Sequence, residues 1–341
     1  MAQINKPSEY FNTKLYTGNG STQSITGVGF QPDWIWIKRR DVSEHHCLED
    51  VLRGAGYSVR TSGTDAQQFR STDITSFDSD GFSLGSNGEV NINSGTFASW
   101  NWLAGGTGVS NTDGSITSTV SANTTSGFSI VSYTGTGSAA TIGHGLGTVP
   151  KVIISKKLNS TSSWMVYHAS LGNNKEMYLN ATNASSDASA TWNSTTPTSS
   201  VWSVSTDANN TSGSTYISYV FAEKKGFSKF GSYTGNGNAD GTFVYTGFKP
   251  AFVICKMTSA SGQNWELNDN KRNPYNEAKN TLRPNTADAE DGTFNTCDLL
   301  SNGFKLRTSN DATNQSSATY IYMAFAENPL VGTNNIPACA R

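Results

Sequence analysis

The stretch YTGNG at residues 16–20, followed by GFQPDWIWIK at residues 29–38, occurs three times in related form along this chain of 341 residues. Each later copy keeps the Tyr-Thr-Gly turn, a Gly-x-x-Pro group and an apolar run that ends in Lys. These copies are YTGTG at 133–137 with GTVPKVIISK at 147–156, and YTGNG at 233–237 with GFKPAFVICK at 247–256. A repeat of roughly a hundred residues predicts tandem domains of one fold, because a unit of that length can bury its own core.

The copies also share their endings, which lie at residues 96–104, 215–223 and 319–327. A short aromatic lead-in precedes each Tyr-Thr-Gly turn, and the lead-in strand most simply belongs to the unit that follows it. These markers predict a first domain at 1–106, a second domain with its connector strand at 107–224, a third domain at 225–328, and an extended tail at 329–341.

Composition and pattern favour an all-β fold. The chain has 33 Gly and only 15% charged residues, with many Ser, Thr and Asn. Thr and aromatic residues suit half-buried strands, whereas Gly and Asn supply turns. Short apolar runs such as 34–37 predict buried strands, and Asp80-Gly81 and Asn302-Gly303 predict tight turns ahead of further strands. We therefore predict three tandem β-sandwich or jelly-roll domains.

Three local features refine this prediction. The closing strand of the third copy, residues 319–327, alternates in pattern, so one face should be core and the other partly exposed. Residues 48–52 could form a short helical turn. The connector at 105–126 contains Ile116 and Val120, which suggest an added strand rather than a floppy linker.

Charge and apolar patterning argue against two classes of partner. The net charge is -2 with no basic stripe, which gives no electrostatic footprint for nucleic acid. No apolar run resembles a signal peptide or reaches membrane-spanning length, so we expect synthesis in a cytoplasm and no membrane insertion.

The cysteines and histidines do not form a recognisable metal or disulfide pattern. Cys47, Cys255, Cys297 and Cys339 lie far apart and are expected to be isolated thiols. Histidines occur at 45, 46, 144 and 168, and we expect them in solvated loops. Adjacent His45 and His46 lack the spacing that places two ligands on one metal, so a site with Cys47 and Glu49 is not favoured.

Two groups of carboxylates remain as a calcium alternative. Asp78 and Asp80 lie beside Gly81, and 288–291 holds Asp288, Glu290 and Asp291. Neither group has the EF-hand pattern, and turn chemistry alone explains Asp80-Gly81. We therefore expect no cofactor. No nucleophile elbow or phosphate loop is present in the required context, so no catalytic residue is assigned and no enzymatic activity is expected.

Aromatic residues are the best candidates for binding. Alternation along a strand places Trp34 with Trp36 on one face, and Trp100 with Trp102 on one face, where we expect core packing. Four other tryptophans lie in the variable middles of the copies, among polar neighbours. Such rings suit a sugar or protein surface, although packing remains the alternative for each. These candidate ligand contacts are Trp164, Trp192, Trp202 and Trp265.

The repeated residues resemble an uncharacterised repeat domain of virion-associated proteins from tailed bacteriophages, especially aquatic ones. The resemblance lies in residues 16–20, 29–38, 53–54, 76–82 and 100–105 of the first copy, and in 127–131, 144–147 and 164–168 of the second. The third copy departs from it, with Trp265-Glu266-Leu267 in place of the Trp-x-Val-Tyr-His pattern. The resemblance implies a concanavalin-like β-sandwich and a place on the virion, often in tail fibres or other appendages. It supplies no catalytic residue.

These observations leave three hypotheses for function. The first is a virion structural protein, a tail fibre or appendage, that adheres to a host-surface glycan or protein through its variable loops. The second is a capsid or tail decoration protein that cements other virion proteins and binds no receptor, and the third is a polysaccharide-degrading tailspike. We also expect a homo-oligomer, for which a trimer is common in phage fibres, although the chain has no coiled-coil heptads.

Overall fold

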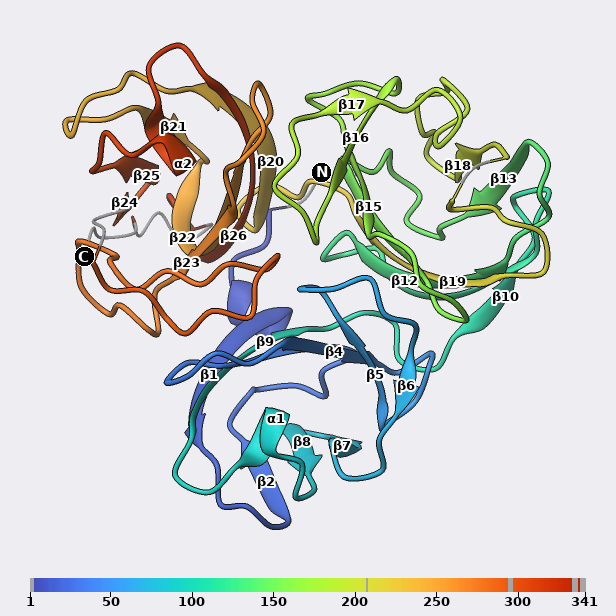
Figure 1. Ribbon diagram of the computed structural model, residues 1–341, viewed down its shortest axis with the longest axis horizontal. Coiled ribbons are helices and arrows are strands. Elements are labelled where there is room, and N and C mark those ends of the chain that lie inside the picture. Colours follow the sequence, from blue (N-terminus) through green and yellow to red (C-terminus); the bar gives the residue numbers. More distant parts are fainter. Residues whose placement is uncertain (1–2, 207, 294–296, 333–336, 338–341) are drawn as a thin grey trace.

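The computed structural model describes residues 3–206, 208–293, 297–332 and 337, and their regular structure is nearly all β (Figure 1). Besides a 3-10 turn, η1 (Pro7–Glu9), the described helices are two single turns, α1 (Gly88–Asn91) and α2 (Asp311–Asn314). Within the described ranges, no helix is long and apolar enough to cross a membrane. The predicted all-β class is therefore confirmed.

Residues of the first copy form a six-stranded sheet in the order β1-β9-β3-β4-β5-β6 and a three-stranded sheet in the order β2-β8-β7. The strands are β1 (Phe11–Thr17), β2 (Gln23–Thr26), β3 (Trp34–Arg39), β4 (His46–Asp50), β5 (Tyr57–Arg60), β6 (Gln68–Phe69), β7 (Ile74–Asp78), β8 (Gly81–Leu84) and β9 (Thr96–Trp102). The expected helical turn at 48–52 was wrong in its bounds, because Leu48 to Asp50 complete strand β4 and the turn follows at 51–53, where the N–H of Gly54 bonds the carbonyl oxygen of Asp50.

Residues of the second copy form an eight-stranded sheet in the order β10-β11-β12-β19-β14-β15-β16-β17 and a pair of β13 with β18. The strands are β10 (Val109–Asn111), β11 (Ser118–Asn123), β12 (Phe128–Thr134), β13 (Ala140–Gly143), β14 (Val152–Lys157), β15 (Met165–His168), β16 (Lys175–Tyr178), β17 (Ser186–Asp187), β18 (Val201–Val204) and β19 (Thr215–Phe221). The added connector strand is confirmed as β11, which contains Val120 and pairs with β12.

Residues of the third copy form a four-stranded sheet in the order β20-β26-β22-β23 and a three-stranded sheet in the order β21-β25-β24. The strands are β20 (Ser228–Thr234), β21 (Phe243–Tyr245), β22 (Phe248–Met257), β23 (Trp265–Asp269), β24 (Cys297–Leu300), β25 (Gly303–Leu306) and β26 (Thr319–Pro329). Most of the predicted tail at 329–341 lies outside the described residues.

The repeated sequence markers occupy equivalent places in the three larger sheets. In each copy the closing strand runs between the lead-in strand and the apolar strand: β9 between β1 and β3, β19 between β12 and β14, and β26 between β20 and β22. The Asp80-Gly81 turn joins β7 to β8, as predicted. Gly81 has φ 150°, and a Cβ there would lie 1.9 Å from the carbonyl oxygen of Ile25, so the β2–β8 pairing itself requires glycine.

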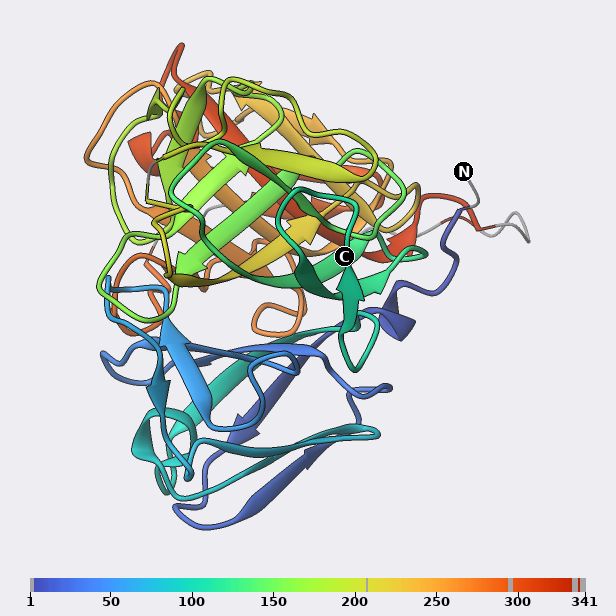
Figure 2. The same cartoon turned by 90° about the vertical axis from the view of Figure 1, so that its right-hand side faces the viewer.

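The three larger sheets surround one shared interior instead of lying in a row (Figures 1 and 2). We call this interior the central core. Its rings contact one another across copies, with centroids 4.2 Å apart for Trp34 and Tyr219, and 5.7 Å apart for Phe221 and Phe325. Its aromatic members are Phe11, Trp34, Trp36, Trp100, Trp102, Phe128, Trp164, Tyr219, Phe221, Phe227, Phe230, Phe252, Trp265 and Phe325.

The central strands of the larger sheets, such as β3, β14 and β22, are therefore buried on both faces. In β26, Met323 and Phe325 face the central core, whereas Tyr320 and Tyr322 pack into a second cluster against the smaller sheet of the same copy. The expectation that one face of the closing strand is partly exposed was wrong, because both layers cover it. The predicted shared face of Trp34 with Trp36, and of Trp100 with Trp102, is confirmed as the central-core face.

Candidate functional site

The four tryptophans expected to contact a ligand are buried. Their exposed fractions are 0% for Trp164, 1% for Trp192, 1% for Trp202 and 2% for Trp265. Trp192 and Trp202 pack inside the second copy, while Trp164 and Trp265 belong to the central core. The polar residues next to these tryptophans in the sequence did not mean that the rings are exposed. A large apolar ring can be buried even where the residues beside it are polar. None of these rings is presented at the surface.

Two of these tryptophans join neighbouring copies. Trp164 of the second copy donates from its ring Nε1 to the carbonyl oxygen of Arg60 in the first copy, at 2.8 Å. Trp265 of the third copy donates in the same way to the carbonyl oxygen of Tyr178 in the second copy, at 3.0 Å. Each bond satisfies a buried polar atom and fixes how two sheets meet.

The lysines that end the three repeated stretches make equivalent contacts. Each is fully buried, and each donates from Nζ to a carbonyl oxygen of another copy. Lys156 reaches Thr64 in the first copy at 3.0 Å, and Lys256 reaches Thr182 in the second at 3.4 Å. Lys38 reaches Ala287 in the third copy at 3.2 Å, which closes the ring.

These buried ammonium groups are structural. Burial lowers the pKa of each lysine, Lys38, Lys156 and Lys256, to about 8. A buried lysine with a lowered pKa can serve as a nucleophile. Here each amine also bonds a second carbonyl close to itself in the chain, such as that of Met257 for Lys256 at 2.8 Å. These three amines therefore join the copies and are not presented to a substrate.

A second set of polar contacts also joins each pair of neighbouring copies. The hydroxyl of Tyr219 in the second copy donates to Asp50 Oδ2 in the first, at 2.9 Å. Nε2 of His168 in the second copy lies 3.2 Å from the carbonyl oxygen of Tyr322 in the third. At the third junction, Nε1 of Trp100 in the first copy donates to Asp269 Oδ2 in the third, at 3.0 Å.

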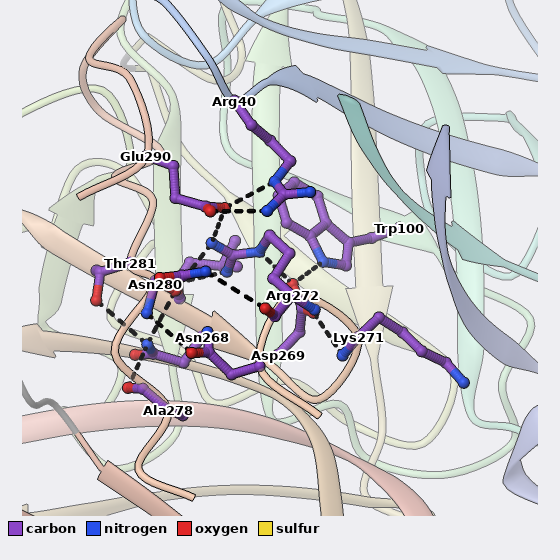
Figure 3. Close-up of polar contacts among 12 residues, drawn as sticks. Arg40, Trp100, Asn268, Asp269, Lys271, Arg272, Ala278, Asn280, Thr281 and Glu290 are labelled. Atoms are coloured by element: carbon purple, nitrogen blue, oxygen red, sulfur yellow. Dashed lines mark hydrogen bonds and ion pairs between the residues drawn. The ribbon is translucent and has the colours of Figure 1, made fainter. Parts of the chain in front are cut away.

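The junction between the first and third copies carries an ion network that is buried at Arg272 and Asp269 and partly buried at Arg40 and Glu290, drawn in Figure 3. Arg272 donates from Nε to Asp269 at 2.6 Å and from Nη1 to Glu290 at 3.0 Å. Glu290 also accepts two bonds from the guanidinium of Arg40 in the first copy. Burial alone would raise the pKa of Asp269, but the charge of Arg272 and the hydrogen bonds from Arg272 and Trp100 together outweigh it, so the pKa is lowered. These charges neutralise one another and hold the two copies together.

The histidine prediction was wrong for three of the four residues. His46, His144 and His168 are buried, and burial lowers the pKa of each below its usual value, to about 4 for His168. The Nδ1 atom of His168 accepts a bond from the backbone N–H of Ser170, which leaves the proton on Nε2, the nitrogen facing Tyr322.

The carboxylates of the calcium alternative are engaged by other groups. Asp80 accepts the backbone N–H groups of Gly27 and Gly29. Asp291 accepts a bond from Arg283 at 3.0 Å, and Glu290 belongs to the ion network. Among the residues that the structure describes, no group of three or more His, Cys, Asp or Glu side chains is arranged to hold a metal.

An open cleft between the second and third copies is the best candidate for a binding site. Its volume is about 550 Å³, and we call it the lysine cleft. It lies between the 148–151 loop, the 223–229 segment that joins the two copies, and residues 245–247. It is lined by Thr148, Val149, Lys151, Glu223, Lys224, Lys225, Gly226, Ser228, Lys229, Tyr245, Thr246 and Gly247.

The lysine cleft is positively charged. Its lining contains four lysines and one glutamate, a formal excess of three positive charges. Lys229 pairs with Glu223 at 2.8 Å, while burial lowers the pKa of Lys224. Tyr245 is 57% exposed at the edge and can offer a ring to a ligand. A cleft of this charge favours an anionic partner.

Sequence reasoning missed this cleft because its walls come from segments nearly a hundred residues apart. The signal that could have found it is the basic run EKKGFSK at 223–229, which breaks the otherwise low charge of the chain. It lies at the junction between two copies, where two elements meet and a cleft can form.

Comparison with known proteins gives a family but no activity. A search of curated proteins and of solved structures found no match. One family model matches residues 6–329, from the residue before η1 to the last residue of β26, and thus runs through all three copies. The chain therefore belongs to the family described as "Domain of unknown function (DUF7483)".

Proposed function

We propose that the protein is a structural and adhesive component of a tailed-bacteriophage virion, in a tail fibre or another appendage. In this proposal three β-sandwiches close around the central core as one rigid body, and the lysine cleft contacts an acidic glycan on the host surface. The proposal includes no catalytic step. The resemblance of the repeated motifs supports the virion setting.

The charge of the lysine cleft carries the adhesive part of the proposal. Acidic polysaccharides present repeated carboxylate or phosphate groups, and several lysines around one cleft suit such a chain because an ammonium bonds an anion in many orientations. The surrounding body is held by the three junctions described above. A rigid site loses less conformational entropy on binding than a mobile loop.

Binding to immobilised polysaccharides tests the adhesive part. Biolayer interferometry should show stronger binding to an acidic polysaccharide than to a neutral one, and the binding should weaken as salt is raised. The variant Lys151→Glu/Lys225→Glu should bind about tenfold less tightly, since two ionic contacts of the cleft become repulsive. The matched control is Lys279→Glu, an exposed lysine outside the cleft. Equal binding by both variants would overturn the assignment of the cleft.

A map of the virion tests the setting and separates adhesion from decoration. We expect density for this chain on a tail fibre or appendage with the lysine cleft facing outward. Density with the cleft covered by a capsid or tail subunit would instead favour a cement protein. Light scattering after gel filtration measures whether the purified chain forms the predicted homo-oligomer.

A further inference from the structure

The first and third copies contain equivalent helical turns, α1 and α2, and only the turn of the first copy carries a carboxylate at its second residue. The N-cap residues Asn87 and Asn310 each accept the backbone N–H two residues later. Both turns end in a buried Asn, Asn91 and Asn314, whose side-chain amide donates to surrounding oxygens. This correspondence aligns Glu89 of α1 with Ala312 of α2.

In the first copy, Glu89 fills the space between α1 and the larger sheet. Its carboxylate pairs with the guanidinium groups of Arg60 and Arg70, and Arg70 Nη1 lies 2.7 Å from Oε1. The thiol of Cys47, on strand β4 beneath it, also donates to Glu89 at 3.4 Å. The space is thus occupied by the protein's own carboxylate.

In the third copy this space is not filled in the same way. Glu266 takes the place of Cys47, because it pairs with Cys255 as Cys47 pairs with Ile37. Arg283, on the neighbouring segment, takes the place of Arg60. At the position of Glu89 the helical turn carries Ala312, which has no carboxylate. A cleft of about 270 Å³ results, bordered by Asn264, Glu266, Arg283, Asn310, Ala312 and Thr313.

A buried charged side chain lines this cleft. Glu266 is 5% exposed and meets Arg283 Nε through Oε1 at 3.1 Å. A carboxylate has two oxygens and about four acceptor positions, so Glu266 can accept hydrogen bonds from a ligand while it pairs with Arg283.

The charge around the cleft restricts the chemistry of that ligand. Arg283 faces Glu266, Asp291 at 3.0 Å and Asp288 at 3.9 Å, so one guanidinium meets three carboxyl groups. Burial raises the pKa of Glu266 to about 7, and the weaker attraction of the Arg283 charge, which lowers this pKa, does not cancel the rise. An anion is disfavoured here, whereas hydroxyl and ammonium donors can bond the carboxylate.

We propose that this cleft binds a single basic amino-sugar unit, with its ammonium and hydroxyl groups donating to Glu266 and its ring and hydroxyl oxygens accepting from the side-chain amides of Asn264 and Asn310. The cleft is somewhat smaller than the roughly 300–1,000 Å³ of sites for drug-sized ligands, which suits one sugar ring. The inference does not depend on the virion setting or on the lysine cleft, since the two clefts are lined by different residues and differ in charge.

Saturation-transfer NMR with glucosamine, glucose and glucuronic acid tests the proposal on the full chain. We expect transfer to glucosamine, weaker transfer to glucose and none to glucuronic acid. The variant Ala312→Glu introduces the residue of the first copy and should reduce glucosamine binding at least tenfold. Its matched control is Gln315→Glu, an exposed position next to the same helical turn, which should bind as the unchanged protein does.

Two further measurements separate loss of folding from loss of binding, and one cleft from the other. If Ala312→Glu fails to fold by circular dichroism, Glu266→Gln replaces it, and glucosamine should then lose more affinity than glucose does. The lysine-cleft variant Lys151→Glu/Lys225→Glu should retain glucosamine binding, so the two sites can fail separately. Absence of transfer to glucosamine, equal transfer to glucuronic acid, or unchanged binding by a folded Ala312→Glu variant would each overturn the proposal.

Discussion

Removing one hydroxyl group, by Tyr219→Phe, should destabilise the whole chain. This hydroxyl donates to Asp50 at 2.9 Å and accepts a bond from Arg53 at 3.2 Å, so it joins the second copy to an ion pair of the first. The ring itself stays, and with it the stacking on Trp34 at 4.2 Å. The substitution therefore tests the polar contact between two copies without opening a cavity.

The expected loss follows from the charge of the acceptor. A hydrogen bond to a buried charged group contributes about 1.5–3 kcal/mol. Asp50 keeps the Nε of Arg53 at 2.5 Å and two backbone N–H groups, so the carboxylate is not left unpaired. We expect Tyr219→Phe to lower the free energy of unfolding by about 1.5–3 kcal/mol.

Urea unfolding followed by tryptophan fluorescence and by circular dichroism measures this loss. The midpoint should fall while the slope of the transition stays the same, because the surface exposed on unfolding is unchanged. Tyr57→Phe is the matched control, since Tyr57 is 37% exposed, and it should change stability by less than about 0.5 kcal/mol.

A double-mutant cycle with Asp50→Asn gives the coupling between the two copies. We expect a coupling energy of about 0.5–3 kcal/mol. A loss below about 0.5 kcal/mol for Tyr219→Phe, or a coupling energy near zero, would refute the reasoning. The contact would then contribute nothing to the joining of the copies.

Further predictions concern the central core and the buried lysines. Trp34→Ala should cost about 3–5 kcal/mol and destabilise all three copies together, whereas separate transitions in urea would contradict a shared core. Lys256 has a folded pKa of about 8, below its unfolded value, so the unfolded chain binds more protons between pH 8 and about 10. Stability should therefore rise with pH across that window, and chemical denaturation of Lys256→Met should show a smaller rise. An equal rise in both proteins would count against the lowered pKa.

Much of the layout of each sheet could be predicted from the sequence. The repeated stretches set the apolar strand and the closing strand of each larger sheet, and alternation placed Trp34 with Trp36 on one face. These features depend on the pleat of a strand, which a local pattern carries. The turn at Gly81 could be predicted because the Asp-Gly pair favours a tight turn between two strands.

The assembly of the sheets could not be predicted. The sequence pattern of an apolar face is the same whether that face packs against the smaller sheet of its own copy or against a sheet of another copy. The sequence of β26 therefore did not indicate that one of its faces joins a core shared by three copies. The partners of Trp164 and Lys256 are backbone carbonyl oxygens of other copies. Every residue has such a carbonyl, so the sequence does not show which residue is the partner. The same limit hid both clefts, whose walls meet only after folding.

Scanning calorimetry of the full chain tests the shared central core most directly. A shared core predicts one unfolding transition in which the van't Hoff enthalpy equals the calorimetric enthalpy, about 240 kcal/mol near 60 °C for a chain of this length. Two or three resolved transitions, or a van't Hoff enthalpy near one third of the calorimetric value, would show that the copies unfold independently and would contradict it.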